Sequence, residues 1–513
     1  MVELDVLATH PTVYLLATVV VFVMAVAFAK RRRALRHAPP SADHTAIPWA
    51  SGAVPILGHA LAYKKCPASF VVDQCKKVGP IFRLNLAGKV MIVIGNSQQL
   101  LKQIAWQPER KCSSREAVAQ VGFEQTLGAF SVREGTDLHR RTVKTWLRRD
   151  RGGLQGEVPK LYESLKRSLD IELQRLGANS GGEIQVPDVF SLVRRCVLRS
   201  SIERLVGPGV LREQDDLLSK FMVFQDAVED ATAKAAVLPR PIALVVALWP
   251  VQSKRQTLQR RLKSIIERIL AEAEASGDDA GLGPWLQTIK DPANGLSSAQ
   301  GAELVISLLF AAHKNPAIGT AQALLYLLTG KGQSLKQERE LAKREAAALR
   351  EATASEKASV LRTCVAVRRC CLETLRMTAH TLGALRIVQE PLDVKSEAGE
   401  VFRLEPGDNV ALSHIACSWD KNLWGGDAHS YNPLRPEWLP TPSSPHRDGN
   451  SDSENDSAMA CCSASGDAVG KLSAFKMTTF SHGIHVCPGQ RLALGIMQVR
   501  VARFLLAFVL TCG

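Results

Sequence analysis

The sequence predicts a mainly α-helical fold with small β-sheets, and three observations lead to this class. Residues 81–86 and 90–95 are apolar, partly β-branched runs around a turn at 87–89, which is the pattern of a β-hairpin. From about residue 97 the apolar residues recur at spacings of three and four, with Gly or Pro at the breaks, as in consecutive helices. Short strand-like runs return after Leu382. This order is that of a mixed, helix-rich fold and not of alternating βαβ units.

The N-terminus predicts a membrane anchor. Residues 12–29 are uncharged and apolar, a length near the lower limit for spanning a bilayer, and a basic cluster at 30–33 follows at once. Because positive charge favours the cytosolic side, residues 1–11 are expected in the lumen and the remaining chain in the cytosol. A cleaved signal peptide carries its charge before the apolar core, and here the order is reversed. We therefore expect a single-pass protein with a cytosolic body.

The remaining chain is expected to form one large domain behind a stiff connector. Residues 30–58 are basic and proline-rich, and prolines restrict both their own backbone and that of the preceding residue. Residues 59–513 contain no internal repeat and no obvious central linker. Within them, 443–467 is rich in Ser, Asp, Asn and Gly with few large apolar groups, which predicts a flexible surface insertion.

The net charge limits the kinds of partner that the protein can bind, and the cysteine content indicates the redox state of its compartment. A net charge of +14 suits a nucleic acid, an anionic membrane surface or an acidic protein partner. The basic residues are scattered through amphipathic segments with little aromatic interleaving, so no nucleic-acid binding is expected. The chain has 12 cysteines, some in adjacent pairs such as Cys370 and Cys371, which indicates reduced thiols rather than a disulfide framework.

Cys487 is the strongest candidate for chemistry. It lies in a glycine- and proline-flanked loop, residues 480–489, directly before an apolar stretch of helical period. Taken alone, a Cys-Pro-Gly turn before a helix is more often structural, but a thiolate there could also hold a haem iron while glycines let the main chain approach the sulfur.

The loop resembles the haem-binding signature of the cytochrome P450 family, Phe-x-x-Gly-x-Arg-x-Cys-x-Gly. The matching residues are Phe480, Gly483, Cys487 and Gly489, and His485 replaces the arginine. The resemblance implies a cytochrome P450 fold, with haem (iron protoporphyrin IX) bound by these five residues and Cys487 as the ligand of the metal. Further family motifs follow in the family's order.

Two other segments resemble family motifs and predict a structural network. Glu373 and Arg376 lie three residues apart on one helical face, where they can form a bidentate pair, although such pairs are common on exposed helices. Tyr431 to Arg435 resembles the family's Phe-x-Pro-x-Arg segment, with tyrosine in place of phenylalanine. The resemblance assigns Glu373, Arg376 and Arg435 to a buried network beneath the haem, and so to folding and haem retention rather than to catalysis.

The resemblance also implies partners for the haem propionates. Arg386 follows Arg376 at the distance where family members place a strand arginine on a propionate, and a guanidinium suits a carboxylate. His485 is expected to be the second partner, with a charge that depends on pH. His139 is placed opposite the other propionate, although a solvated basic helix is an equal alternative for its segment.

On the distal side of the haem the chain departs from the family. Residues 303–328 predict a long buried helix with a break in the middle that resembles the oxygen-binding kink. Aligned on Ala311 and Ala312, the usual acid becomes Lys314 and the usual threonine becomes Asn315, so the proton relay is altered. An asparagine here, with a proline nearby, is similar to the branch of cholesterol and bile-acid hydroxylases and prostacyclin synthase. We assign Ala311, Ala312 and Asn315 to the catalytic face.

The resemblance implies a microsomal monooxygenase of the endoplasmic reticulum membrane, with residues 59–513 as its catalytic domain. It implies that NADPH-cytochrome P450 reductase delivers electrons and that the basic surface docks this acidic partner. The expected substrate is a small lipophilic molecule: a sterol, a terpenoid or another secondary metabolite. An alternative on the same scaffold is an isomerase that rearranges a lipid peroxide without NADPH.

The C-terminal end leaves a third possibility open. Family members add a strand hairpin that lines the substrate pocket after the last helix, whereas this sequence stops at Gly513. A truncated gene model and a more open pocket are the two interpretations of this difference. A further hypothesis for the function is a haem-free membrane protein that keeps the scaffold as a binding module because its C-terminal part is missing.

Overall fold

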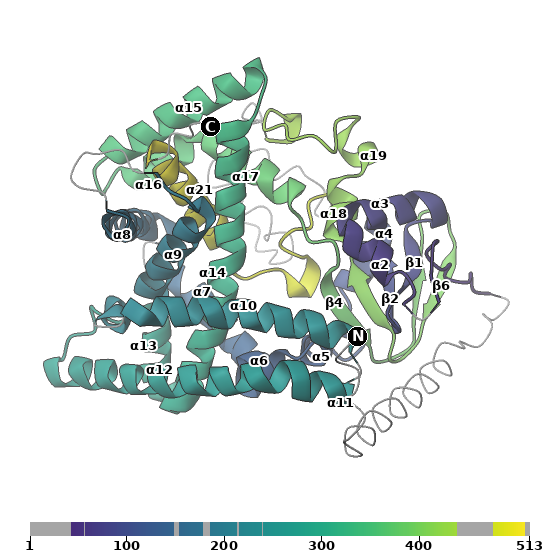
Figure 1. The fold of residues 1–513 in the computed structure, drawn as a ribbon, viewed down its shortest axis with the longest axis horizontal. Helices are drawn as coiled ribbons and strands as arrows, with labels where there is room; N and C mark the ends of the chain where they lie inside the picture. Colours follow the sequence, from purple (N-terminus) through teal and green to yellow (C-terminus); the bar gives the residue numbers. More distant parts are fainter. Residues whose placement is uncertain are drawn as a thin grey trace, which may run out of the picture.

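A small sheet-containing part lies beside a large helical part in the computed structural model of the protein (Figure 1). The structure describes residues 43–55, 57–147, 153–177, 185–212, 215–238, 240–438 and 476–507. The helix-rich class with small sheets is confirmed. The predicted anchor at 12–29 and the insertion at 443–467 lie outside these ranges, and within them no helix has the length and apolarity needed to cross a bilayer.

The main sheet has five strands in the order β1-β2-β7-β4-β3. The strands are β1 (Ile81–Leu86), β2 (Lys89–Ile94), β3 (Cys112–Ser113), β4 (Gly383–Val388) and β7 (Asn409–Leu412). The predicted hairpin is confirmed, since β1 and β2 pair antiparallel. Strand β7 pairs parallel with β2 and antiparallel with β4. A second hairpin joins β5 (Leu392–Lys395) and β6 (Val401–Leu404). The sheet therefore joins an early and a late segment of the chain.

The last part of the predicted connector is attached to this sheet. The backbone N–H of Ala50 donates to the carbonyl of Arg83 at 2.9 Å, and the N–H of Arg83 donates to the carbonyl of Pro48 at 2.7 Å. The ring of His59 contacts the carbonyl of Ala50 at 2.8 Å. These bonds orient the start of the domain against strand β1.

The helices of the described ranges form the larger part of the molecule. They are α2 (Ala60–Lys65), α3 (Pro67–Val78), α4 (Gln98–Ala105), α5 (Ser114–Gln120), α6 (Phe123–Leu127), α7 (Thr136–Trp146), α8 (Gly153–Arg175), α9 (Val189–Ser201), α10 (Asp215–Val237), α11 (Arg240–Ala243), α12 (Trp249–Ser276), α13 (Pro284–Lys290), α14 (Ser298–Thr329), α15 (Gln333–Glu351), α16 (Lys357–Thr363), α17 (Val365–Met377), α18 (His414–Ser418), α19 (Lys421–Trp424) and α21 (Gln490–Ala507). Short π-helical segments include η2 (Ser131–Gly135), η4 (Ile202–Val206) and η6 (Leu244–Leu248), and the 3-10 segments are η5 (Pro208–Leu211), η7 (Pro292–Asn294), η8 (Pro436–Trp438) and η10 (Gly483–His485).

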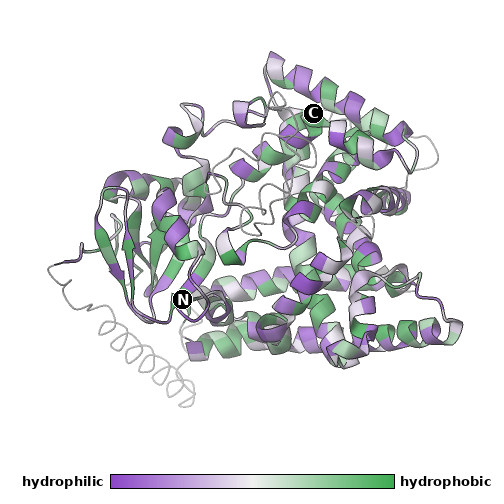
Figure 2. Cartoon of the chain, turned by 180° about the vertical axis from the view of Figure 1, so that it is seen from behind, coloured by the Kyte–Doolittle hydropathy of each residue, from purple (hydrophilic) through white to green (hydrophobic). Residues whose placement is uncertain are grey.

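The main core lies where α8, α9, α14, α15, α17 and α21 meet. Leu165, Val197, Leu324, Val367 and Phe504 are among its fully buried members. Figure 2 shows hydrophobic and hydrophilic residues interleaved along the outer helices, as expected for helices that bury one face. Removal of these apolar side chains from water is the main stabilising contribution to such a core.

Helix α14 corrects one expectation from the sequence. It begins with a capping box formed by Ser297 and Gln300 and is helical without interruption to Thr329, so the predicted break is wrong. Pro316 lies inside the helix and lacks the N–H that would bond the carbonyl of Ala312. The helix tolerates the proline because packing against α9, α12, α17 and α21 supports both halves.

Candidate active site

A cavity of about 540 Å³ is lined by both the Cys487 loop and helix α14. Cys487, Pro488 and Leu492 line it from the loop and the start of α21, while Ala311 and Ala312 line it from α14. Helices α6, α7, α8 and α13 and segment η4 add apolar side chains to the lining, which also contains polar and charged residues such as Asp137, Arg140 and Arg204. The structure therefore brings together the cysteine and the two alanines that the sequence assigned to opposite faces of one site.

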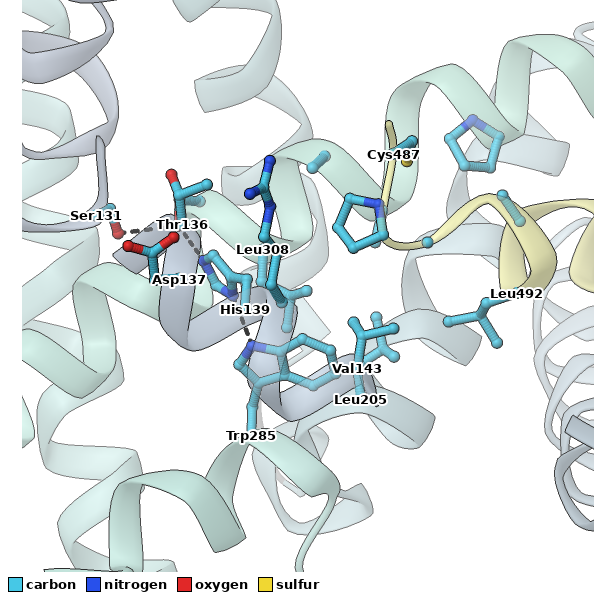
Figure 3. A pocket seen from close by; sticks show the side chains of 18 of the residues that line it. Ser131, Thr136, Asp137, His139, Val143, Leu205, Trp285, Leu308, Cys487 and Leu492 are labelled. Carbon is cyan, nitrogen blue, oxygen red and sulfur yellow. Dashed lines mark hydrogen bonds between the residues drawn. The ribbon is translucent and has the colours of Figure 1, made fainter. Parts of the chain in front are cut away.

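Hydrogen bonds within the loop hold Cys487 in place. The backbone N–H of Cys487 donates to the carbonyl of Phe480 at 2.9 Å, and the N–H of Ser481 donates to the carbonyl of Thr478 at 2.8 Å. The segment η10, Gly483–His485, forms the turn between these residues. Figure 3 shows Cys487 in the strand-like approach to α21, ahead of Leu492. The thiol is thus presented at a fixed point of the cavity wall.

The environment of the Cys487 thiol combines burial with local positive potential. Burial raises the pKa of the thiol, whereas a backbone hydrogen bond at Gly489 and the charge of Arg140 act to lower it. A metal ion bound at the sulfur would favour the thiolate much more strongly than these groups do. The half-buried position suits a thiol that ligates a metal within the cavity and is shielded from bulk water.

Gly483 is required by the backbone of this loop. Its φ of +67° lies in the left-handed region, and a Cβ at this position would lie 2.1 Å from the carbonyl oxygen of Ala105. We expect Gly483→Ala to displace the loop, with roughly 1–2 kcal/mol from the backbone conformation alone and a further cost from the clash. The midpoint of thermal denaturation (Tm) and the haem-to-protein ratio should both decrease. Gly426→Ala is the matched control, since a Cβ there meets no atom within 4 Å; equal effects of the two substitutions would contradict the prediction.

Two buried residues next to the loop have donors without protein acceptors. Arg386 is 3% exposed, and although its Nη1 donates to the carbonyl of Leu385 at 2.8 Å, its Nε and Nη2 have no partner. His485 contacts Glu109 through Nδ1 at 3.4 Å, and its buried Nε2 has no partner. Buried polar atoms of this kind are costly unless they are satisfied. The carboxylates of a haem would satisfy the donors of Arg386, and also that of His485 when its proton is on Nε2. The residues present therefore fit the cofactor.

The sequence predicts that the charge of His485 depends on pH, whereas in the structure the ring of His485 is neutral around neutral pH. Burial, followed by the charge of Arg386, lowers the pKa of His485 to about 4. The imidazole is therefore neutral at neutral pH and has a single ring proton, which it can donate either from Nδ1 to Glu109 or from Nε2 to another carboxylate, but not to both. The positive charge at this edge of the site comes from Arg386, Arg140 and Arg115.

His139 belongs to a hydrogen-bonded group in the cavity wall. Trp285 Nε1 donates to His139 Nδ1 at 2.8 Å, so the ring proton is on Nε2, which lies 3.1 Å from the hydroxyl of Ser307 (Figure 3). Ser307 in turn contacts the hydroxyl of Ser131 at 2.9 Å. Burial lowers the pKa of His139 to about 4, so the ring is neutral. The propionate contact of His139 stays a prediction, and it would have to replace one of these two bonds.

The polar residues of the central turn of α14 point in different directions. Asn315 is exposed and does not line the cavity, so its catalytic role stays a prediction. Lys314 forms ion pairs with Asp226, at 3.2 Å, and with Glu229, both on α10. His313 is fully buried and its Nε2 contacts the carbonyl of Arg194 at 2.9 Å. The lysine that replaces the family acid is thus part of a contact between helices α14 and α10.

Glu373, Arg376 and Arg435 form a buried network. Arg376 donates to Glu373 through Nε at 2.9 Å and through Nη2 at 2.8 Å, and Arg435 Nε donates to Glu373 at 3.0 Å. Trp438 Nε1 also donates to Glu373 at 3.0 Å, and Arg376 Nη1 donates to the carbonyl of Ala428 at 2.7 Å. The side chains of Glu373 and Arg376 are 0% exposed. The network ties α17 to the segment that follows α19.

Several cavity residues were not identified from the sequence. Ser131, Trp285, Ser307 and Arg500 line the cavity together with the predicted residues. They come from four different elements, and none lies in a recognisable motif. Ser307 could have been predicted as a cavity residue, because it lies four residues before Ala311 and hence on the same helical face. The others are defined by tertiary packing alone.

A half-buried thiol in a glycine-shaped loop, opposite a long helix and beside a buried arginine with unpartnered N–H groups, is the arrangement of a haem-thiolate protein. The chain belongs to the cytochrome P450 family, whose model matches residues 48–512. Members of this family bind the haem iron through a cysteine thiolate, and the match identifies the protein as a haem-dependent monooxygenase.

The chain is also similar to two sterol-metabolising relatives. It is 21% identical to lanosterol 14-alpha demethylase of Bos taurus over 379 residues, 74% of this chain and 70% of the relative. It is 22% identical to lanosterol 14-alpha demethylase of Mus musculus over 390 residues, 74% of this chain and 71% of the relative.

Proposed function

We propose that the protein oxidises a small lipophilic substrate, a sterol, a terpenoid or another secondary metabolite, with O₂ and electrons from NADPH-cytochrome P450 reductase. The observation that carries this proposal is the apolar cavity lined by Cys487 on one side and by Ala311 and Ala312 on the other. Haem ligated by a thiolate supplies O₂ activation, because the sulfur donates electron density that favours O–O cleavage. Hydroxylation is the expected outcome.

In this proposal each part of the chain has a separate task. Cys487 holds the iron, and Arg386 and His485 hold the carboxylates of the cofactor. The small side chains of Ala311 and Ala312 leave room for substrate and O₂ next to α14. Asn315 occupies the position of the family threonine, and its amide can donate and accept hydrogen bonds but does not titrate; because it is exposed and does not line the cavity, we assign it no contact with the substrate. The apolar lining excludes water from the reaction space.

The substrate class is proposed from the lining and from the relatives. Leu127, Val132, Leu308 and Ile496 line the cavity, so binding would bury apolar surface. The two relatives are named for demethylation of lanosterol, which supports a sterol or a molecule of similar shape.

The electron donor is proposed from the charge around the cysteine loop. Arg140 on α7 lines the cavity and contacts the carbonyl of Ile484 at 3.4 Å. Arg141 and Lys144 on the same helix are exposed. A basic helix next to the loop suits an acidic reductase, because complementary charge accelerates association. We further propose a location in the endoplasmic reticulum membrane, because the proposed anchor at 12–29 would hold this protein on the same membrane surface as the reductase.

A product assay separates this function from the peroxide isomerase. The haem-loaded full-length protein is combined with reductase, NADPH and a panel of sterols, terpenoids and fatty acids that first shift the haem spin state. We expect an oxygenated product that requires NADPH. Rapid rearrangement of a lipid hydroperoxide without NADPH, together with no NADPH-dependent product, would support the isomerase instead. A reduced carbon monoxide spectrum without a haem-thiolate band would support the haem-free binding module.

A further inference from the structure

Arg500 is a buried cation in the wall of the same cavity. It lies on α21, ten residues after the first residue of the helix, Gln490, which corresponds to about 15 Å along the axis. Its side chain is 2% exposed. The Nη2 group donates to the hydroxyl of Ser201 at 3.1 Å, but the buried Nη1 group has no hydrogen-bond partner. None of the described carboxylates lies within ion-pair distance of it.

Other buried arginines nearby have carboxylate partners. Arg194 pairs with Asp226 at 2.9 Å, and Arg199 pairs with Glu172 at 3.3 Å. A buried charge without a partner costs several kcal/mol, which is why such groups are normally paired or deprotonated. Burial lowers the pKa of Arg500 to about 9, so the group still carries its charge at neutral pH. The missing partner is therefore expected to come from outside the described chain.

The neighbours of Arg500 suit a negatively charged group. Ser201 at the end of α9 supplies a hydroxyl, and Arg204, three residues on, also lines the cavity while pairing with Glu157 at 2.7 Å. Leu205 and Ile496 provide apolar surface. The polar groups at this end are thus two guanidinium groups and one hydroxyl, within an otherwise apolar wall.

We propose that the end of the cavity at Arg500 binds a carboxylate, held by Arg500 Nη1 and the Ser201 hydroxyl. The carboxylate is either the acid end of a lipophilic ligand or a small free anion, and both present the same acceptor atoms. Charge-assisted hydrogen bonds of this type are the strongest that a guanidinium makes. The site needs the cavity and α21, but it does not depend on monooxygenation or on the electron donor.

Calorimetric titration of the haem-loaded full-length protein tests the site with three probes: dodecanoate, dodecanol and acetate. We expect Arg500→Met to weaken dodecanoate binding about 10-fold to 100-fold, because a hydrogen bond to a charged group contributes about 1.5–3 kcal/mol. Dodecanol binding should be unchanged. Arg503→Met is the matched control, since Arg503 lies on the same helix but does not line the cavity.

Each outcome decides the proposal or the source of the anion. Arg500-dependent binding of dodecanoate without acetate binding assigns the site to the acid end of a ligand. Arg500-dependent binding of acetate assigns it to a free anion. Equal binding of dodecanoate by the wild type and Arg500→Met, with no effect of acetate on either, would overturn the proposal.

The stability of the variants supplies an independent measurement. Without added anion, Arg500→Met should have a Tm equal to or above that of the wild type, since it removes an uncompensated buried charge. A saturating anion should raise the Tm of the wild type alone. If Arg500→Met does not fold, Ser201→Ala replaces it in the titration, and an unchanged affinity for dodecanoate in Ser201→Ala would overturn the proposal.

Discussion

Cys487→Ala is expected to abolish the haem-thiolate band in the reduced carbon monoxide spectrum and to reduce NADPH-dependent product formation to background. The methyl group offers no ligand to the iron, and no other cysteine lines the cavity within the described residues. The fold should persist, because Cys487 is half-buried and its backbone N–H still reaches the carbonyl of Phe480. Absorbance spectroscopy and circular dichroism of the purified variant measure the two effects separately.

The matched control for Cys487→Ala is Cys66→Ala. Cys66 is exposed, lies between α2 and α3 and does not line the cavity. This variant should retain the full spectrum and the activity of the wild type. A haem-thiolate band that survives in Cys487→Ala would show that another residue holds the iron.

Glu373→Ala is expected to yield protein without haem and to lower the free energy of unfolding by about 3–5 kcal/mol. The substitution leaves the guanidinium groups of Arg376 and Arg435 buried without their carboxylate, and Trp438 loses its acceptor. Glu373→Gln should be less harmful, since an amide keeps one oxygen acceptor. Chemical denaturation and the haem-to-protein ratio measure both consequences.

Glu338→Ala distinguishes loss of stability from loss of haem. Glu338 and Arg369 form another bidentate pair with little exposure, at 3.0 and 2.8 Å, between α15 and α17. Its removal should destabilise the protein, but the folded fraction should keep its haem, because this pair lies away from the cavity lining. If Glu373→Ala and Glu338→Ala lose haem in proportion to stability alone, the specific role of the Glu373 network is refuted.

The parts of the fold that could be predicted are those determined by neighbouring residues. The hairpin follows from two apolar, partly β-branched runs around a short turn, and its pairing over 81–94 is confirmed. The loop before α21 was identified because its glycines and Cys487 are contiguous. Helical spacing places Glu373 and Arg376 on one face, but their assignment to a buried network came from the resemblance to the family motifs.

The distal side could not be predicted to the same extent. The proline at 316 indicated a break in the helix, but packing on four neighbouring helices keeps α14 continuous. Lys314 was interpreted as an altered proton relay, whereas its charge is matched by Asp226 and Glu229 on another helix. The role of Asn315 stays a prediction, since its side chain is exposed in the structure.

The sequence by itself determined the class of this protein, because the cysteine loop, the Glu373 and Arg376 pair and the order of the elements are local features. Tertiary structure alone decided which groups share the cavity. Ser201, Trp285 and Arg500 are far apart in the chain, and they meet there because α9, α13 and α21 pack around α14. Whether a buried charge such as Arg500 has a partner depends on residues of every element that packs around it, and these residues are distant from it in the sequence.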